Sequence, residues 1–417
     1  MEKLIKCIEV NGEIAVPASK SIAQRAIVAA VLAKESTYLC DVSLCDDTKR
    51  ALDVAKTWGA EVKEMGSDYL IIPEERSKKE GVLTLFCGES GLLARMITPV
   101  AALLDREVVI MGSGSMLKRP MQMLVPPLQE LGVNIHACAG GLPLTLHGPL
   151  RGGECRLDGS ISSQVITGLL MALPLAEKDS ILHVENPKSR PYIDMTLDVL
   201  AAFGIEVERE DYRCFKIRGR QAYRSCIFPV EGDWSGASCF LVAGALAGRV
   251  KITNLNINSA QADRVLLEVL RQVGVEVIVE PGEKWDCVTV VRNELRAFEY
   301  DATDSPDLFP ALVALASGCS GTSCIKGARR LLYKESNRVE SLREEFAKLN
   351  IGIEVDEDIM RVTGGNITGG EVSSRNDHRI AMALATAALC SSAPVIIKQA
   401  EVVSKSYPTF WSDFLKL

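Results

Sequence analysis

The sequence has few of the residues that mark a metal site, a membrane span or an exported protein. It contains four histidines and no Cys-x-x-Cys pair, so it offers no metal-binding motif. Its most apolar stretch, residues 380–397, is interrupted by Ser391, Ser392 and Pro394, which argues against a membrane span. No apolar signal segment and no Arg- and Ser-rich transit segment opens the chain. We therefore expect a cytoplasmic protein without bound metal.

Aromatic residues are also scarce, at 5%, but the rest of the composition is that of a folded globular protein. Of the 417 residues, 47% are hydrophobic and 24% are charged, which excludes disorder and collagen-like structure. The net charge of -7 argues against a nucleic-acid partner. The 13 cysteines lie mainly in apolar surroundings, and we expect them to be reduced and buried. The length predicts two or three domains.

A turn followed by an apolar helix recurs six times along the chain. Each copy passes from a short polar turn into a segment rich in Ala and Leu, with equivalent points at positions 21, 90, 162, 235, 305 and 376. Successive points therefore lie 69 to 73 residues apart. A second landmark keeps this period: an apolar residue, a Gly and an alternating strand, as at Gly274, with Asn350 replacing the Gly in a later copy. Such a fixed period indicates an internally repeated architecture.

Each copy predicts a helix, a strand, a second helix and two further strands. The fourth copy places these elements at residues 235–247, 250–254, 261–273, 275–279 and 287–291. The first helix is apolar almost all round and should be buried, whereas the second carries charge on one face and should cover the outside. The opening strands, residues 4–10 and 13–16, can supply the elements that the sixth copy lacks after residues 395–398.

The repeats also predict how the chain is divided. Residues 1–18 and 235–417 are expected to form a first, discontinuous lobe that carries both termini, and residues 19–234 a second, inserted lobe. Two chain crossings, near Ser19 and near Asp233, then predict a hinge and an active site in the cleft between the lobes. We expect the cleft to close when ligands bind.

Helix N-termini that meet at such a cleft would offer free N–H groups and partial positive charge to phosphate or carboxylate groups. Basic residues lie in or near the turns that begin these helices: Lys20, Arg25, Arg95, Arg119, Lys334, Arg338, Arg379 and Lys405. On a chain of net negative charge, cations at these places favour an acidic small ligand rather than a polymer.

Each of these polar residues, taken singly, also has a purely structural interpretation. Glu335 and Arg338 are spaced as a solvated helix pair, and Asp307 after Pro306 is typical of a charge that compensates a helix dipole. Ser162 is typical of a helix cap, as are Asn376, Asp377 and Ser163. Lys405 alone would be a surface charge. The functional interpretation is favoured because all of them fall at the same phase of the repeat.

Four segments resemble the motif series of the enolpyruvyl transferases, in particular the members that use shikimate-3-phosphate. These are Ser19-Lys20-Ser21-Ile22-Ala23-Gln24-Arg25-Ala26, Gly159-Ser160-Ile161-Ser162-Ser163-Gln164, Lys334-Glu335-Ser336-Asn337-Arg338 and Asn376-Asp377-His378-Arg379. With Lys405 the series covers nearly the whole chain. The resemblance implies a mixed α/β (α+β) fold of two similar lobes, each with three repeated βαβαββ units around buried helices, an inside-out α/β barrel.

The resemblance also implies a reaction on the route to chorismate and the aromatic amino acids. The enolpyruvyl group of phosphoenolpyruvate passes to the 5-hydroxyl of shikimate-3-phosphate through a tetrahedral adduct, with release of phosphate and without a cofactor. The partners expected are these two small molecules, with no nucleic acid and no membrane. Nothing exposed and apolar in the sequence demands a protein partner, so we expect a monomer.

The residue roles that the resemblance implies fall into three groups. Glu335 and Lys20 would handle the proton at the methylene carbon, and Asp307 would take the proton of the substrate hydroxyl. The phosphoenolpyruvate site would comprise Lys20, Gly91, Arg119, Gln164, Arg338, Arg379 and Lys405. The shikimate-3-phosphate site would comprise Ser21, Arg25, Ser162, Ser163, Gln164, Ser189, Tyr192, Asp307 and Lys334. His378 would lie behind Arg379, outside the direct contacts.

Some positions depart from the family pattern. Glu89 puts a negative charge where the family usually has an Asn, which puts the local anion contacts in doubt. The other departures are Leu92, Arg330, Leu331, Leu332, Tyr333 and Asn337. Our hypothesis is that these tune affinity without abolishing the reaction.

Three other functions remain open. A transferase that uses UDP-N-acetylglucosamine fits less well, because such enzymes have Lys-Asn at the first turn and commonly a Cys at the place of Gly114. A non-catalytic anion-binding protein would be expected to have lost Lys20, Asp307 or Glu335, yet all three are present. A nucleotide-using enzyme lacks support, because the chain has neither GxxxxGK[ST] nor a GxGxxG after a strand.

Overall fold

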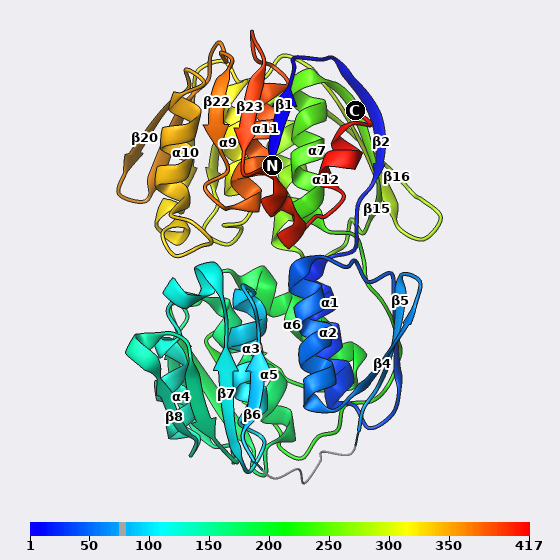
Figure 1. Ribbon diagram of the computed structural model, residues 1–417, viewed down its shortest axis with the longest axis vertical. Helices are drawn as coiled ribbons and strands as arrows, with labels where there is room; N and C mark the ends of the chain where they lie inside the picture. Colours follow the sequence, from blue (N-terminus) through cyan, green and yellow to red (C-terminus); the bar gives the residue numbers. More distant parts are fainter. Residues whose placement is uncertain (75–80) are drawn as a thin grey trace. The chain divides into compact units, whose positions relative to one another are not determined.

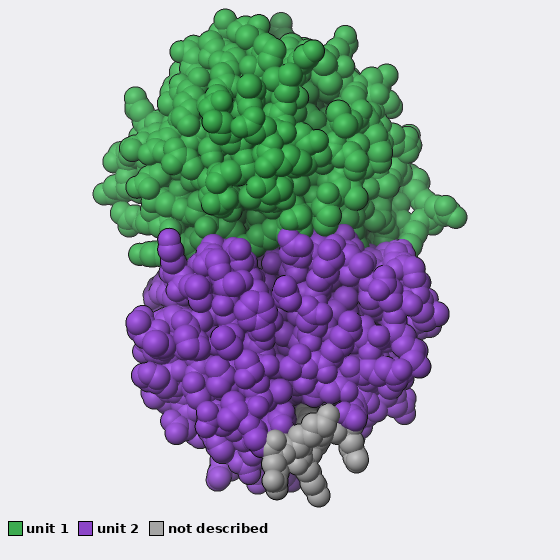
Figure 2. Space-filling model, viewed as in Figure 1, with its two compact units in different colours: residues 1–19, 231–417 green, residues 20–230 purple. Residues whose placement is uncertain are grey.

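The computed structural model describes residues 1–74 and 81–417. They form two compact units: unit 1 consists of Met1–Ser19 and Glu231–Leu417, and unit 2 of Lys20–Val230 (Figure 2). No helix in residues 1–74 and 81–417 combines the length and the apolar character that crossing a membrane requires. The two units are described separately below, with the element labels of Figure 1.

Unit 2 begins with a helix and alternates helices and strands. Its first half contains α1 (Lys20–Leu32), β3 (Thr37–Cys40), α2 (Asp46–Trp58), β4 (Glu61–Met65), β5 (Asp68–Ile72), β6 (Leu83–Phe86), α3 (Gly91–Ala101), β7 (Glu107–Met111), η1 (Gly114–Lys118), η2 (Gln122–Leu124) and α4 (Val125–Glu130). Its second half contains β8 (Asn134–Ala137), η3 (Cys138–Gly140), β9 (Leu144–His147), β10 (Glu154–Asp158), α5 (Ser163–Ala172), η4 (Leu173–Leu175), β11 (Ser180–Glu185), α6 (Arg190–Ala202), β12 (Glu208–Glu210), β13 (Cys214–Ile217) and β14 (Ile227–Pro229).

Unit 1 contains both ends of the chain. Its first elements are β1 (Glu2–Ile5), β2 (Val10–Ala15), α7 (Trp234–Ala247), β15 (Gly248–Leu255), η5 (Ala262–Val265), α8 (Leu266–Gln272), β16 (Glu276–Glu280), β17 (Asp286–Val291), β18 (Glu299–Asp301) and α9 (Phe309–Ser317). The rest are β19 (Thr322–Lys326), η6 (Ala328–Leu331), α10 (Arg338–Ala347), β20 (Gly352–Asp356), β21 (Ile359–Thr363), β22 (Gly370–Ser373), α11 (His378–Ala388), β23 (Val395–Lys398), η7 (Ala400–Lys405) and α12 (Phe410–Phe414).

The strands of the described residues form six small sheets. Those of unit 2 have the orders β14-β3-β5-β4, β6-β7-β9-β8 and β10-β11-β13-β12; those of unit 1 are β16-β17-β15-β2, β18-β19-β21-β20 and β1-β23-β22. In the sheet β6-β7-β9-β8, β6 and β7 run parallel, and β9 pairs antiparallel with both β7 and β8. The opening strands both join strands of unit 1: β1 pairs antiparallel with β23 and completes the sixth copy, as predicted, whereas β2 pairs parallel with β15 and belongs to the sheet of the fourth copy.

The apolar helices predicted at the start of each copy are buried, as expected. In unit 1, α7, α9 and α11 contact one another in the core, and every residue of α9 and α11 is buried (Figure 1). In unit 2, every residue of α3 is buried, and α3 lies against α5. The polar residues that begin these helices cap them: Asp233 accepts from two backbone N–H groups of α7, and Ser162 from one of α5. The helix starts are therefore set by local capping as well as by burial.

The fourth copy shows how closely the pattern matches the structure. The expected elements correspond to α7, β15, η5 with α8, β16 and β17, and the second helix differs because its first turn is 3₁₀. The helix-ending positions have the predicted left-handed backbone, with φ of 99° at Gly274 and 63° at Asn350. One expectation is corrected: the 13 cysteines are all free thiols, but only five are buried, six are partly buried, and Cys7 and Cys138 are exposed.

Candidate active site

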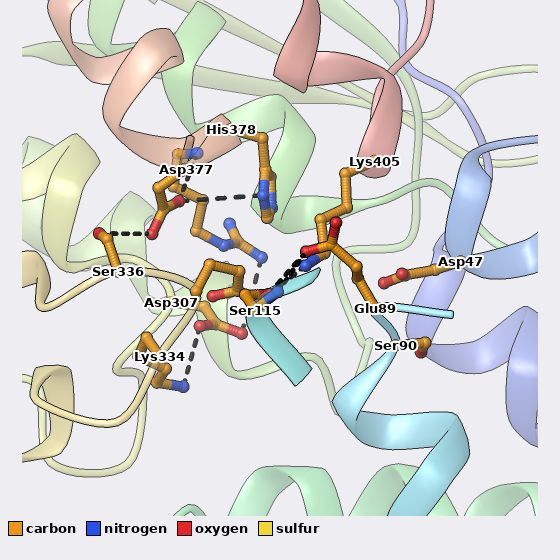
Figure 3. Close-up of polar contacts among 12 residues, drawn as sticks. Asp47, Glu89, Ser90, Ser115, Asp307, Lys334, Ser336, Asp377, His378 and Lys405 are labelled. Atoms are coloured by element: carbon orange, nitrogen blue, oxygen red, sulfur yellow. Dashed lines mark hydrogen bonds and ion pairs between the residues drawn. The ribbon is translucent and has the colours of Figure 1, made fainter. Parts of the chain in front are cut away.

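In unit 1, charged side chains gather where several helices begin. Asp307 lies in the turn before α9, and Arg338 is the first residue of α10. Asp377 caps α11, where its side chain accepts a hydrogen bond from the backbone N–H of Arg379 at 3.0 Å. We call this group the unit 1 cluster, which consists of Asp307, Lys334, Glu335, Arg338, Asp377, Arg379 and Lys405. Figure 3 labels four of them: Asp307, Lys334, Asp377 and Lys405.

Arg338 lies at the centre of the contacts of the unit 1 cluster, and its side chain, like that of Asp377, is 0% exposed. Its Nε donates to Asp377 Oδ2 at 2.7 Å, Nη2 to Glu335 Oε2 at 2.7 Å, and Nη1 to Asp307 Oδ1 at 3.0 Å. Burial opposes its charge, but these carboxylates together raise the pKa of Arg338 above its ordinary value. Because the guanidinium already binds three carboxylates, its assignment to a substrate carboxylate stays a prediction.

Asp307 is surrounded by positive charge. Its Oδ1 accepts from Lys334 Nζ at 3.1 Å and from Arg338 Nη1 at 3.0 Å, and Arg379 Nη2 lies 3.6 Å from Oδ2. Burial alone would raise the pKa of this carboxyl, but the charges of Lys334, Arg379 and Arg338 hold it well below its usual value. Asp307 is therefore a carboxylate over the physiological pH range.

Two further predicted residues are Lys405, a member of the unit 1 cluster, and His378, which lies beside it. Lys405, at the end of η7, places Nζ 3.9 Å from Glu335 Oε1. The His378 ring is buried, and its Nδ1 lies 3.9 Å from Asp377 Oδ1 (Figure 3). The unit 1 cluster thus brings four cations together with three carboxylates, a formal excess of one positive charge. Such a set suits an anionic ligand that takes over contacts now made by the carboxylates.

In unit 2, a second group lies at the starts of α1, α3 and α5. We call it the unit 2 cluster, which consists of Lys20, Gln24, Asp47, Ser90, Arg95, Arg119 and Gln164. Lys20 Nζ donates to Asp47 Oδ2 at 2.8 Å, and Ser90 Oγ donates to Gln24 Oε1 at 2.8 Å. Side-chain contacts therefore connect α1 to α2 and to α3 at their N-terminal ends.

Arg95 connects α3 to the rest of the unit 2 cluster. Its Nη1 donates to Gln164 Oε1 at 2.7 Å, and its Nη2 donates to the Pro120 carbonyl at 2.9 Å. The neighbouring Arg119 lies against the first residue of α3, since a Cβ built on Gly91 would lie 2.6 Å from Arg119 Cζ. The structure therefore brings Gly91, Arg119 and Gln164 together within unit 2, three residues that the sequence assigns to one site.

Arg25 has a different environment from the other predicted cations. Its Nε donates to Thr196 Oγ1 at 2.9 Å, Nη1 to the Ser21 carbonyl at 2.7 Å, and Nη2 to the Tyr192 carbonyl at 3.1 Å. The side chain is buried, which lowers the pKa of Arg25 to about 10. The guanidinium connects α1 to α6, and its role in holding a substrate stays a prediction.

The predicted serines lie at helix starts of unit 2. Ser162 Oγ accepts from the backbone N–H of Gln164 at 3.2 Å, so it is the N-cap that the sequence allowed, and Ser163 is buried beside it. Ser189 precedes α6 with a left-handed φ of 55°. Their roles in holding shikimate-3-phosphate stay predictions.

Sequence reasoning missed two carboxylates. Asp47, which contacts Lys20, had only a weak signal as an acidic residue in the first turn of a helix. Asp263 is buried and accepts a hydrogen bond from Ser235 Oγ, and burial raises its pKa to about 7 against the opposing charge of Arg379. Neither residue falls in a motif of the repeat. Within residues 1–74 and 81–417, no group of three or more His, Cys, Asp or Glu side chains is arranged to hold a metal ion.

The chain shares its fold with solved enolpyruvyl-transfer enzymes and its sequence with their relatives. The structure of EPSP synthase from Acinetobacter baumannii superimposes with a TM-score of 0.84 at 26% identity, over 99% of this chain and 97% of that one. The 3-phosphoshikimate 1-carboxyvinyltransferase of Thermococcus kodakarensis is 38% identical, over 98% of both chains. That of Clostridium acetobutylicum is 37% identical, over 99% of this chain and 97% of its own.

The family model described as EPSP synthase (3-phosphoshikimate 1-carboxyvinyltransferase) matches residues 6–414. The chain belongs to this family. The fold is accordingly the mixed α/β architecture with small sheets that the described residues show, and the resemblance seen in the motifs is confirmed.

Proposed function

We propose that the chain transfers the enolpyruvyl group of phosphoenolpyruvate to the 5-hydroxyl of shikimate-3-phosphate, with release of phosphate, and that residues of both units serve this one reaction. Family membership supports the reaction, and it places the chain in aromatic amino acid biosynthesis. The residue roles rest on one observation: Lys334, Arg338 and Arg379 all contact the carboxylate of Asp307. The substrates carry two phosphates and two carboxylates between them, which the cations of the two clusters can neutralise.

The proposed reaction needs two proton transfers, which we assign to residues of both clusters. A proton adds to the methylene carbon of phosphoenolpyruvate, the 5-hydroxyl attacks the adjacent carbon, and a tetrahedral adduct forms. Loss of phosphate and of a proton from the resulting methyl group then forms the enol ether. We assign the methylene proton to Glu335 with Lys20, and the hydroxyl proton to Asp307.

Asp307 is a weak base while three cations contact it, because they hold its pKa well below the usual value. Bound substrate anions would share those cations, and the pKa of Asp307 would rise toward the range in which a carboxylate accepts a proton efficiently. Arg379 and Arg338 can then hold the phosphoenolpyruvate carboxylate, while Lys20, Arg119, Gln164 and Lys405 hold its phosphate. Substrate binding thus prepares the base for the step that it catalyses.

The architecture fits this proposal. We infer that each unit consists of three βαβαββ copies around buried helices, the inside-out α/β barrel of the family. The sheet order β6-β7-β9-β8, with its parallel first pair and antiparallel hairpin, supports this, because the other four-stranded sheets repeat it. The predictions of a monomer and of a cytoplasmic location are part of the same proposal.

Phosphate release tests the proposed function. Phosphoenolpyruvate and shikimate-3-phosphate together should release phosphate at a steady rate, and either alone should not. The same assay with UDP-N-acetylglucosamine as acceptor tests the related reaction. Release only with UDP-N-acetylglucosamine would mean that the acceptor is wrong, and no release with either acceptor would overturn the proposal.

The pKa of Lys334 predicts how the KM for shikimate-3-phosphate depends on pH. Burial lowers the pKa of its amine to about 8, with Asp307 opposing the shift, so the amine loses its charge as the pH rises through about 8. If Lys334 holds shikimate-3-phosphate as a cation, the KM for that substrate should rise above pH 8, by up to about tenfold per pH unit. The phosphate group of shikimate-3-phosphate is fully ionised above pH 8, so its own titration does not change the KM in this range.

Lys334→Arg is the matched control for this pH dependence. Its guanidinium keeps the positive charge through this range, so the KM of the variant should stay nearly flat between pH 7 and 9.5 even if it is higher overall. Initial rates across this range, at saturating phosphoenolpyruvate, measure both slopes. Equal slopes for the parent and Lys334→Arg would show that another group causes the dependence.

A further inference from the structure

The turn before α3 contacts the segment that carries Arg119. That segment, residues 112–120, follows β7 and contains η1. Glu89 Oε2 accepts two hydrogen bonds from Ser115, one from the backbone N–H at 3.1 Å and one from Oγ at 2.7 Å (Figure 3). The backbone adds a third contact, from the Ser113 N–H to the Gly88 carbonyl at 2.9 Å. The start of the segment is thereby attached to the turn.

The other end of the segment contacts the same region of α3. Arg95 Nη2 donates to the Pro120 carbonyl at 2.9 Å. The Arg119 guanidinium lies so close to Gly91 that a Cβ there would be 2.6 Å from both Cζ and Nη1. Glu89 and Gly91, two residues apart, therefore contact the two ends of one segment, and the second contact is made by the Arg119 side chain itself.

The space for the Glu89 carboxylate depends on Gly114. A Cβ on Gly114 would overlap Glu89 Oε1, and Gly114 has a left-handed φ of 52°. A residue with a side chain at this place would therefore collide with the carboxylate and strain the backbone. The departure at Glu89 and the Gly at position 114 are complementary, because the Gly leaves space for a carboxylate that accepts two hydrogen bonds from Ser115.

We infer that Glu89 is a positioning residue for Arg119: by holding Ser115 it fixes residues 112–120 so that the guanidinium stays against Gly91. This inference rests on the proposed function, in which Arg119 binds the phosphate of phosphoenolpyruvate. Glu89 does not contact the substrate in this role. A loosened segment would leave Arg119 in many conformations, and binding would then have to order it again.

Kinetics of Glu89→Ala test the inference. We expect the KM for phosphoenolpyruvate to rise about tenfold, as expected for the loss of hydrogen bonds to a charged acceptor, with kcat and the KM for shikimate-3-phosphate within about twofold. Glu89→Gln keeps an acceptor oxygen for Ser115 and should stay within about threefold of the parent. Ser115→Ala loses one of the two bonds and should fall between them.

A double-mutant cycle tests whether the effect passes through Arg119. In the Arg119→Ala background, Glu89→Ala should change the KM for phosphoenolpyruvate by less than about twofold, because no guanidinium remains to be positioned. An equal rise in both backgrounds, or an unchanged or lower KM for Glu89→Ala alone, would overturn the inference. A lower KM would mean that the charge of Glu89 acts mainly by repelling the anionic substrate.

Hydrogen exchange gives a readout that does not depend on activity. The amide of Ser115 is bonded to Glu89, so a peptide covering residues 112–120 should exchange faster by about tenfold in Glu89→Ala and much less so in Glu89→Gln. Unchanged exchange would overturn the inference whatever the kinetics show. If the parent protein releases no phosphate, the proposed function is contradicted instead. Failure of this inference and failure of the proposed function are therefore distinguishable.

Discussion

Replacing Asp307 by Asn is expected to lower kcat by about 10²- to 10⁴-fold, the range typical of a lost general base. The amide keeps the shape of the side chain, but it cannot take a proton from the attacking hydroxyl. It also leaves Lys334, Arg338 and Arg379 with less negative charge beside them. Phosphate release at saturating concentrations of both substrates measures the change.

Asp301→Asn is the matched control for this prediction. Asp301 lies on the neighbouring strand β18, where its exposed carboxylate pairs with Lys326 at 3.0 Å, and it belongs to neither cluster. Its rate should equal that of the parent. A loss of less than tenfold in Asp307→Asn, with the control unchanged, would remove Asp307 from the role of base.

The largest effect on stability is expected from Asp377→Ala. Its carboxylate accepts from Arg338 Nε at 2.7 Å and caps α11, and both side chains of the pair are 0% exposed. Removing it leaves a buried guanidinium short of a partner, which typically costs 3 to 5 kcal/mol; we expect about 3, because Glu335 and Asp307 still contact Arg338. Urea-induced unfolding measures the free energy difference.

Two further variants separate the reasons for this loss. Asp377→Asn keeps an acceptor for the cap and loses only the charge, so its stability should lie between those of the parent and of Asp377→Ala. Glu210→Gln removes an exposed partner of Lys216 and should leave the unfolding midpoint unchanged. If Asp377→Ala unfolds at the same urea concentration as the parent, the buried pair does not stabilise unit 1.

Much of the fold could be predicted from the sequence because each element has a local signal. Apolar residues all round a segment predicted the buried helix α7, and the Gly at position 274 predicted where the following helix ends. The short helix α12 was not predicted. It has five residues, and its order comes from packing, with the Phe410 ring 5.3 Å from that of Phe240 on α7. Such contacts leave no periodic pattern in the sequence.

The candidate site shows the same limit. The phase of the repeat predicted which turns carry polar groups, and the structure brings Asp307, Glu335 and Arg338 into direct contact. The phase of the repeat did not predict that Asp377 pairs with Arg338, 39 positions away, or that Asp47 pairs with Lys20, 27 positions away. The first pair joins two neighbouring copies and the second joins two helices of one copy, so both depend on tertiary packing. The substrate roles of the single residues stay predictions until kinetics test them.

The central claim is that both clusters serve one transfer reaction, and the products of a single reaction mixture test it most directly. Phosphorus NMR of the protein with phosphoenolpyruvate and shikimate-3-phosphate should show one inorganic phosphate and one enol ether of shikimate-3-phosphate for each phosphoenolpyruvate consumed. Lys20→Ala in unit 2 and Asp307→Ala in unit 1 should each prevent both signals. Inorganic phosphate with the shikimate-3-phosphate signal unchanged, or full turnover in either variant, would contradict the account.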